Sequence, residues 1–341
     1  MASFADRFRQ LREDRQTLLV LGVDPDFQRI GEDFGSTPIP LPDAFVSVAI
    51  EDGIPEFLSP DPVESLLGAF QQFATFDSGF HTQFTNFLRF CALNIFAARD
   101  EIIGVKFQAA CFEILGALGV FALSRLITLT RALGLLTIVD AKRGDIGVSL
   151  ARYAETYLGS EDKPLSLAAD AMTVNPLVGA DTWEAFVPYL RDGRQVFMLT
   201  YPSSPGAKAF AEALVGDEPV YRHIARQAHK LMAKERLTAS PAPVGFVVGA
   251  KSPDIAAEIR KEVRDALFLV PGVGAQGGKM SEAADCAGPE RLALFPVSRG
   301  LLEAYRTSGF GARELPQRFF HATVAKAASL NAELRRALAW T

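Results

Sequence analysis

Cysteine is scarce in this sequence. Its 341 residues include three cysteines, Cys91, Cys111 and Cys286, which are odd in number, far apart and never arranged as C-x-x-C. Small secreted proteins rely on densely paired cysteines, and structural zinc sites need closely spaced ones. The pattern therefore excludes a disulfide framework and a zinc cluster, and it predicts a protein of the reducing cytoplasm.

Long apolar runs and an excess of positive charge are also missing. No stretch approaches the roughly 20 apolar residues that span a bilayer, and the start, MASFADRFRQLREDRQ, is too charged for a signal peptide. The 35 basic and 40 acidic residues give a net charge of −5, which argues against a broad nucleic-acid surface or an anionic membrane surface. We therefore expect no membrane and no nucleic acid as partners, and any phosphate must be bound at a local site.

The chain contains short apolar runs that are rich in β-branched residues. Eight of them occur, at residues 17–23, 102–107, 135–141, 170–175, 195–200, 244–249, 266–270 and 292–298. Runs this short, apolar on both faces and bounded by Gly, Pro, Asp or Asn, are typical of parallel strands covered on both sides. Helical patterns lie between them, for example at 111–134, 220–237 and 252–265. Alternating strands and helices predict an α/β fold, a (β/α)8 TIM barrel, with a doubly wound sheet as the alternative.

The interval between the first two strands is longer than a strand-to-strand crossover requires. Residues 31–95 within it begin with the proline-rich STPIPLPDAF and continue with apolar residues at three- and four-residue spacing. This spacing predicts two amphipathic helices, whose many phenylalanines we expect to pack on the barrel or on a partner subunit. We interpret residues 1–341 as a single barrel domain and residues 31–95 as a helical insertion within it.

Charged residues follow three of the strands directly. Asp24 ends the first in GVDPD, Lys106 ends the second in GVKFQ, and Asp140 with Lys142 ends the third in VDAKRGDIG. Side chains alternate along a strand, so Asp140 and Lys142 share one face, and barrel enzymes place their reactive groups at these carboxyl ends. Asp145 lies beyond the strand and need not point into the same site. A surface salt bridge is the alternative, but so dense a charge pattern after an apolar strand favours an active site.

A glycine-rich stretch follows the seventh strand. VPGVGAQGG, residues 270–278, is followed after the eighth strand by PVSRG, residues 296–300. The glycines fit G-x-G-x-x-G, but no acidic residue ends the next strand as a dinucleotide site requires. Barrels commonly hold phosphate between these two loops, where glycine lets the backbone approach closely. We therefore predict a phosphate site, with Arg299 as the cation and Gln276 as a neutral donor; a simple turn with a salt bridge is the alternative.

Seven motifs together resemble the orotidine 5′-phosphate decarboxylase family, in the subgroup whose signature reads like DAKRGDIG. They are GVDPD, VKFQAACFE, DAKRGDIG, MTVNPLVG, VFMLTYPSSPG, VPGVGAQGG and VSRG, in the family's order over nearly the whole chain. The resemblance implies a homodimeric barrel that converts orotidine 5′-monophosphate into uridine 5′-monophosphate and carbon dioxide. The reaction chemistry fits without a cofactor, and Lys106 at the end of the second strand, with no His or Glu cluster at ligand spacing, predicts that no metal is needed. The length of residues 31–95 departs from the family, so nothing is carried over to them.

The resemblance also implies a catalytic role for four residues. Lys142 would protonate C6 of the pyrimidine as carbon dioxide leaves, and Asp140 would face the departing carboxylate. Asp145 would enter the site of the neighbouring subunit. Lys106 would hold the charged groups in place and contact a ribose hydroxyl.

Six further residues are implied as substrate-binding. Asp24 would bind the ribose, Ser203 the pyrimidine, and Gln276 with Arg299 the phosphate. Pro271 and Gly277, in the glycine-rich loop, complete this set.

Two other functions remain open from the residues. Magnesium-dependent phosphosugar decarboxylases and aldolases of the same suprafamily share D-x-K-x-x-D, but they have a metal-binding Glu where this chain has Lys106, and a lysine would repel the ion. A catalytically inactive nucleotide-binding regulator is the second alternative, although Lys142 and the aspartates are all present.

Overall fold

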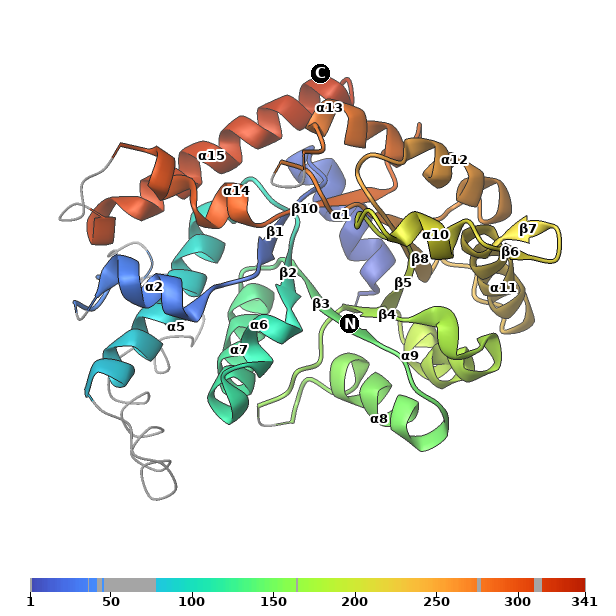
Figure 1. The fold of residues 1–341 in the computed structure, drawn as a ribbon, viewed down its shortest axis with the longest axis horizontal. Helices are drawn as coiled ribbons and strands as arrows, with labels where there is room; N and C mark the ends of the chain where they lie inside the picture. Colours follow the sequence, from blue (N-terminus) through green and yellow to red (C-terminus); the bar gives the residue numbers. More distant parts are fainter. Residues whose placement is uncertain are drawn as a thin grey trace.

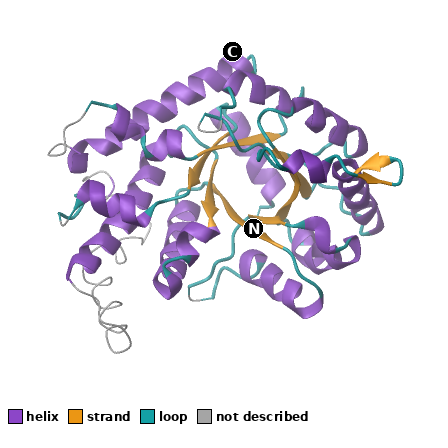
Figure 2. Ribbon diagram, in the orientation of Figure 1, coloured by secondary structure: helices purple, strands orange, loops and turns teal. Residues whose placement is uncertain are grey.

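The computed structural model of the protein describes residues 2–35, 37–41, 45, 78–163, 165–274, 277–309 and 315–340. All eight predicted strands form, and they close into a parallel barrel (Figures 1 and 2). The barrel strands are β1 (Leu19–Val23), β2 (Gly104–Gln108), β3 (Leu136–Arg143), β4 (Ala171–Val174), β5 (Gln195–Tyr201), β8 (Val244–Val248), β9 (Phe268–Leu269) and β10 (Ala293–Val297).

Barrel closure excludes the doubly wound alternative. The strand order is β1-β10-β9-β8-β5-β4-β3-β2, and β1 pairs with both β2 and β10. An open sheet would leave two edge strands, whereas here the first and last strands pair with each other. A small antiparallel hairpin, β6 (Leu214–Val215) and β7 (Glu218–Pro219), lies outside the barrel.

Helices surround the barrel (Figure 2). The α-helices are α1 (Phe4–Arg15), α2 (Phe27–Phe34), α5 (Ser78–Ala98), α6 (Ala109–Glu113), α7 (Gly116–Ala132), α8 (Gly147–Leu158), α9 (Val187–Arg191), α10 (Ala207–Ala211), α11 (Val220–Lys234), α12 (Pro253–Glu262), α13 (Met280–Ala283), α14 (Arg299–Leu302) and α15 (Leu315–Ala337). The 3-10 helices are η2 (Pro176–Val178), η3 (Ala180–Phe186), η4 (Ala284–Ala287) and η5 (Ala304–Thr307). No helix in these described ranges is long and apolar enough to cross a membrane.

The helix predicted over 111–134 is wrong in one respect, because the structure divides this region into α6 and α7. Gly116, the first residue of α7, has a φ of +59°. A residue in the left-handed region interrupts the helical hydrogen-bond pattern, and glycine adopts this conformation without the steric cost of a Cβ. The break leaves Ile114 81% exposed on the surface.

The phenylalanines of α5 belong to the core. Phe84, Phe87 and Phe90 are buried, and Phe90 packs on Phe319 of α15 with ring centroids 5.6 Å apart. These phenylalanines therefore pack on the helices around the barrel, and α5, one of the two predicted helices, also contacts strand β1. The other predicted helix lies outside the described residues, and the bounds of the insertion, 31–95, stay a prediction.

Helix α1 closes the end of the barrel where the strands begin. Ser3 caps it by accepting a hydrogen bond from the Asp6 amide at 3.1 Å. The Phe4 amide donates to the Gly193 carbonyl, just before β5, at 2.8 Å. The opposite end, at the carboxyl ends of the strands, is left open for a site.

Candidate active site

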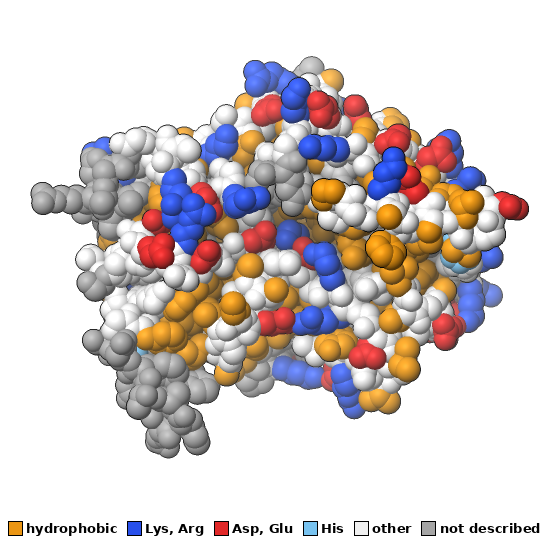
Figure 3. Space-filling view, viewed as in Figure 1, with side chains coloured by type: hydrophobic (Ala, Val, Ile, Leu, Met, Phe, Trp, Pro, Cys, Tyr) orange, Lys and Arg blue, Asp and Glu red, His pale blue; other side chains and the backbone are white. Residues whose placement is uncertain are grey.

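A cavity of about 410 Å³ opens at the carboxyl ends of the strands. Lys/Arg and Asp/Glu side chains gather near the centre of this face (Figure 3). Its lining includes seven of the predicted site residues, namely Asp24, Lys106, Asp140, Lys142, Ser203, Pro271 and Arg299. The structure therefore brings together the charged residues predicted at the strand ends and the residues that the resemblance implied.

Lys106 and Asp140 form the inner part of the charge cluster. Lys106 Nζ donates to Asp140 Oδ2 at 3.0 Å, and the two side chains are 6% and 11% exposed. Burial alone would raise the pKa of Asp140, but the charges of Lys106 and Lys142 and the hydrogen bonds outweigh it and lower the pKa. Burial would likewise lower the pKa of Lys106, but Asp140 and Asp24 raise it. Both groups therefore stay ionised at neutral pH.

Lys142 and Asp24 form the outer part of the cluster, which is open to solvent. Lys142 Nζ donates to Asp140 Oδ1 at 2.5 Å, which confirms that the two side chains share one face. Asp24 Oδ1 lies 3.5 Å from Lys106 Nζ, and Asp24 Oδ2 accepts from Ser298 Oγ at 2.8 Å. Two lysines and two aspartates thus alternate across the floor of the cavity.

Two neutral side chains that the sequence did not reveal complete the contacts of Asp140. Thr173 Oγ1 donates to Asp140 Oδ1 at 2.8 Å. When the side-chain amide nitrogen of Gln108 is turned toward Asp140, it donates to Asp140 Oδ2 and to the backbone carbonyl of Asp140, both at 3.0 Å. Gln108 follows Lys106 by two residues, so the alternation that paired Asp140 with Lys142 could have identified it.

Asp145 does not line the cavity of its own chain. It follows β3, and its Oδ1 accepts from the Ile146 amide at 2.8 Å. Four apolar side chains on the segments that follow β3 and β4, which include the start of α8 and η2, are exposed: Ile146 (64%), Val148 (74%), Leu177 (68%) and Val178 (38%). We call these four side chains the apolar rim.

The glycine-rich loop has the backbone that its sequence predicts. Gly272, Gly274 and Gly277 have φ values of +105°, +77° and +79°, a region in which residues with a Cβ are strained. The Gly274 amide donates to the Gly278 carbonyl at 2.8 Å, which folds the loop tightly. Gln276 lies outside the described residues. Gly277 is in this loop but is not part of the cavity lining.

Arg299 also lines the cavity, at the start of α14 and directly after Ser298, which contacts Asp24. Its side chain is exposed and forms no ion pair with the described part of the chain. A guanidinium that no carboxylate neutralises is suited to a phosphate, which it can bind through two parallel hydrogen bonds. The geometry thus supplies a cation at the expected phosphate end.

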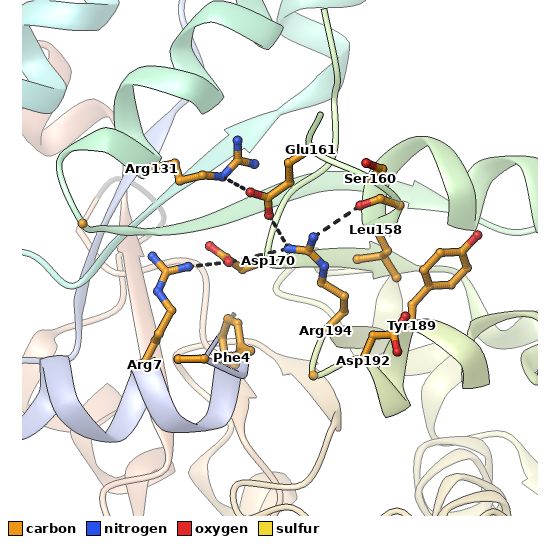
Figure 4. A pocket seen from close by; sticks show the side chains of 14 residues that line it. Phe4, Arg7, Arg131, Leu158, Ser160, Glu161, Asp170, Tyr189, Asp192 and Arg194 are labelled. Carbon is orange, nitrogen blue, oxygen red and sulfur yellow. Dashed lines mark hydrogen bonds and ion pairs between the residues drawn. The ribbon is translucent and has the colours of Figure 1, made fainter. Parts of the chain in front are cut away.

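A larger cavity, of about 630 Å³, lies at the opposite end of the barrel beside α1 (Figure 4). Five of its six charged side chains, all except Asp192, pair with each other. Arg7 donates to Asp170 at 2.5 Å, while Arg131 and Arg194 lie 2.8 and 2.7 Å from Glu161. These ion pairs connect α1 and the end of α7 to residues next to the barrel strands, which indicates a structural role.

Metal ligands do not cluster in the described ranges. No group of three or more His, Cys, Asp or Glu side chains there could hold a metal ion. At the cavity floor the Lys106 ammonium lies between Asp24 and Asp140, where a bridging cation would otherwise have its ligands.

The fold and the site define a (β/α)8 barrel protein whose cavity is lined by alternating lysines and aspartates and by an exposed arginine. The model of the Orotidine 5′-phosphate decarboxylase / HUMPS family matches residues 84–305, and the chain belongs to this family.

Curated relatives and solved structures agree with this assignment. The chain is 34% identical to the orotidine 5′-phosphate decarboxylase of Rhodopirellula baltica over 255 residues, which cover 73% of this chain and 83% of that protein. It is 38% identical to the enzyme of that name from a Roseiflexus species over 226 residues, 65% of this chain and 77% of the relative. The structure of Leishmania donovani OMP decarboxylase has the same fold, with a TM-score of 0.67, 24% identity and 99% coverage of both chains.

Proposed function

We propose that this protein decarboxylates orotidine 5′-monophosphate to uridine 5′-monophosphate, a step of pyrimidine biosynthesis. One observation carries the proposal: an ammonium group, Lys142 Nζ, is held 2.5 Å from a buried carboxylate in a cavity that is also lined by Arg299, an arginine without an ion pair in the described ranges. A substrate with a phosphate at one end and a carboxylate on its base at the other matches this arrangement.

The chemistry follows from the charges. The bond between C6 and the carboxylate breaks, its electron pair stays on C6, and carbon dioxide leaves. The pyrimidine offers no adjacent electron sink for this localised carbanion, so a preorganised cation beside C6 must stabilise it. Lys142 is that cation, and its Nζ donates the proton that C6 takes up; solvent then reprotonates the lysine.

Asp140 and Lys106 keep Lys142 in place for this step. The Asp140 carboxylate faces the substrate carboxylate, so its negative charge favours the departure of that group. How much such ground-state repulsion accelerates the reaction depends on the geometry of the bound substrate. Lys106, held between Asp24 and Asp140, keeps the cluster neutral and lies within reach of the ribose beside Asp24.

The remaining residues bind the nucleotide. Asp24 accepts from a ribose hydroxyl and Ser203 contacts the pyrimidine edge. Arg299 and Gln276 bind the phosphate, and Pro271 and Gly277 set the course of the loop that covers it. Phosphate binding far from C6 contributes binding energy that organises the reacting end.

The two alternative functions fit the cavity less well. A magnesium-dependent phosphosugar enzyme needs a metal-binding carboxylate at the position of Lys106, and the ammonium there repels a divalent ion. An inactive regulator needs no proton donor, yet Lys142 is aimed into the cavity beside a carboxylate that holds it charged.

The test is the absorbance change of orotidine 5′-monophosphate with the purified protein in excess chelator. We expect turnover that survives chelation, and a Lys142→Ala control that lacks it. Activity that the chelator abolishes and magnesium restores would favour the phosphosugar alternative. Nucleotide binding without any turnover by the wild-type protein would identify a regulator.

We further propose that the working unit is a homodimer in which Asp145 serves the partner's cavity. Asp145 does not line its own cavity and lies in the loop after β3, and the apolar rim is exposed next to this loop and next to the loop after β4. These loops are in contact, since a Cβ on Gly144 would lie 2.7 Å from the Asn175 carbonyl. An exposed apolar surface around a functional carboxylate is suited to a second copy of the same chain.

Mixed dimers test this assembly. Lys142→Ala and Asp145→Ala chains are each expected to be nearly inactive alone. After subunit exchange one site of a mixed dimer carries both defects, while the other receives an intact Lys142 and an intact Asp145. Random pairing makes about half of the dimers mixed, so roughly a quarter of all sites should recover. If mass measurement confirms exchange and no activity returns, Asp145 does not act across an interface.

The proposed location is the cytoplasm. Cys91 and Cys286 are buried as free thiols and Cys111 is half-buried. Free thiols persist in a reducing compartment.

A further inference from the structure

Thr173 contacts both residues of the proposed proton-donating pair through one hydroxyl group. Thr173 lies in β4 and is fully buried. Its Oγ1 donates to Asp140 Oδ1 at 2.8 Å and accepts from the Lys142 backbone amide at 2.9 Å. The same Asp140 oxygen accepts from Lys142 Nζ at 2.5 Å. The hydroxyl, the carboxylate and the lysine therefore form one closed set of hydrogen bonds.

The backbone at Lys142 explains why this contact is needed. Lys142 has a φ of +46°, a left-handed conformation that is strained for a residue with a Cβ. The pairing of β3 with β4 shifts register between Val139 and Arg143. In such a bulge the regular ladder is interrupted, and the Thr173 hydroxyl serves as the acceptor for the Lys142 amide.

We propose that Thr173 is a positioning residue for the decarboxylation, one that fixes both the backbone of Lys142 and the orientation of the Asp140 carboxylate. The inference rests on the proposed function and deepens it. Without the Thr173 hydroxyl, Asp140 Oδ1 loses its neutral hydrogen-bond donor. Among the described residues, Lys142 Nζ is then the one donor left to this oxygen. The ammonium is then drawn toward Asp140 and away from C6. The phosphate end, which includes Arg299, is unaffected.

The effect of Thr173 on turnover must be separated from a loss of stability. Thr173→Val keeps the β-branched shape and removes the hydroxyl, whereas Thr173→Ser keeps the hydroxyl. Thr137→Val is a matched control at the other end of the barrel. Thr137 is also fully buried in a strand, and its Oγ1 donates to Asp170 Oδ2 at 2.8 Å and accepts from the Asp170 amide at 2.9 Å.

The experiment compares kcat with nucleotide binding. A reacting group displaced by about 1 Å costs roughly a hundred-fold in rate, so we expect Thr173→Val to lower kcat about a hundred-fold. Its affinity for uridine 5′-monophosphate should stay within about three-fold of wild type, because the contacts at the phosphate end are kept. Thr173→Ser should restore kcat to within about ten-fold. Thr137→Val should lose stability and keep kcat.

Specific outcomes overturn the inference. Wild-type kcat in Thr173→Val, or a loss of nucleotide affinity as large as the loss of kcat, contradicts a positioning role. If Thr173→Val does not fold, Thr173→Cys, whose thiol is a weak hydrogen-bonding group, takes its place with the same expectation.

Hydrogen exchange separates this inference from the proposed function. A wild-type protein inactive on orotidine 5′-monophosphate refutes the proposed function. In that case exchange of the Lys142 amide still tests Thr173: the amide should exchange at least ten-fold faster in Thr173→Val than in wild type. An unchanged rate refutes the contact as an anchor.

Discussion

Asp170, at the closed end of the barrel, offers a stability test that leaves the chemistry untouched. Its side chain is 8% exposed. Oδ2 accepts from the Thr137 amide at 2.7 Å and from Thr137 Oγ1 at 2.8 Å, and Oδ1 accepts from Arg7 Nη1 at 2.5 Å (Figure 4). Asp170→Asn keeps one acceptor oxygen and replaces the other with an NH₂ group. Whichever way the amide is turned, that group faces a donor.

The expected cost of this change is about 3 kcal/mol. Removing one partner of a buried ion pair costs about 3–5 kcal/mol, and each lost hydrogen bond to a charged group about 1.5–3 kcal/mol. Arg7 is 22% exposed and keeps its bond to the Leu135 carbonyl at 2.8 Å, so water and this carbonyl partly compensate. The loss therefore falls at the lower end of the range.

Urea unfolding followed by circular dichroism measures the effect. Asp192→Asn is the control, because Asp192 lines the same cavity, is exposed and forms no ion pair within the described ranges. Its free energy of unfolding should stay within about 0.5 kcal/mol of wild type. Both variants should keep wild-type kcat. A loss below about 1 kcal/mol in Asp170→Asn, or an equal loss in Asp192→Asn, refutes the reasoning.

Three further expectations concern the open end of the barrel. Lys142→Ala should lower kcat at least about a thousand-fold while uridine 5′-monophosphate still binds, because it removes both the proton donor and the charge beside C6; substantial turnover in steady-state kinetics would contradict its role. Arg299→Ala should weaken nucleotide binding about a hundred-fold by calorimetry, through the loss of charge-assisted bonds to phosphate, and should also slow turnover; unchanged affinity would place the phosphate elsewhere. Burial, with the charge of Asp24, raises the pKa of the Cys111 thiol to about 11, so about one thiol in a thousand is ionised at pH 8. Alkylation of Cys111 by iodoacetamide, followed by mass spectrometry, should accelerate about ten-fold per pH unit up to that value, and a rate that levels off near pH 8.5 would show an ordinary thiol.

The barrel was predictable because each strand is a local signal. The run 135–141, for example, is apolar on both faces and ends in charged residues, and β3 forms there. Strand alternation also predicted that Asp140 and Lys142 lie side by side. Both inferences need only neighbouring residues, and this is why they could be made without a structure.

The parts that could not be predicted depend on residues far apart in the chain. Thr173 acquires its role from the register shift between β3 and β4 and from the left-handed backbone of Lys142. Neither feature has a local sequence signal, since lysine is not a residue that favours positive φ. The local pattern around Asp145 likewise does not predict which site this residue serves, and in the dimer that we propose its site depends on a second chain.

The four charged side chains at the cavity floor differ in their exposure to solvent. Lys106 and Asp140 are 6% and 11% exposed, whereas Asp24 and Lys142 are 36% and 39% exposed. Dissolved salt screens charges that solvent reaches and acts much less on buried ones. Added salt therefore weakens the attraction between the open cavity and an arriving anionic nucleotide, while the Lys106 and Asp140 pair keeps its strength. In this protein ionic strength therefore acts on the capture of the substrate and leaves the buried Lys106–Asp140 pair, to which Lys142 is hydrogen-bonded, largely unchanged.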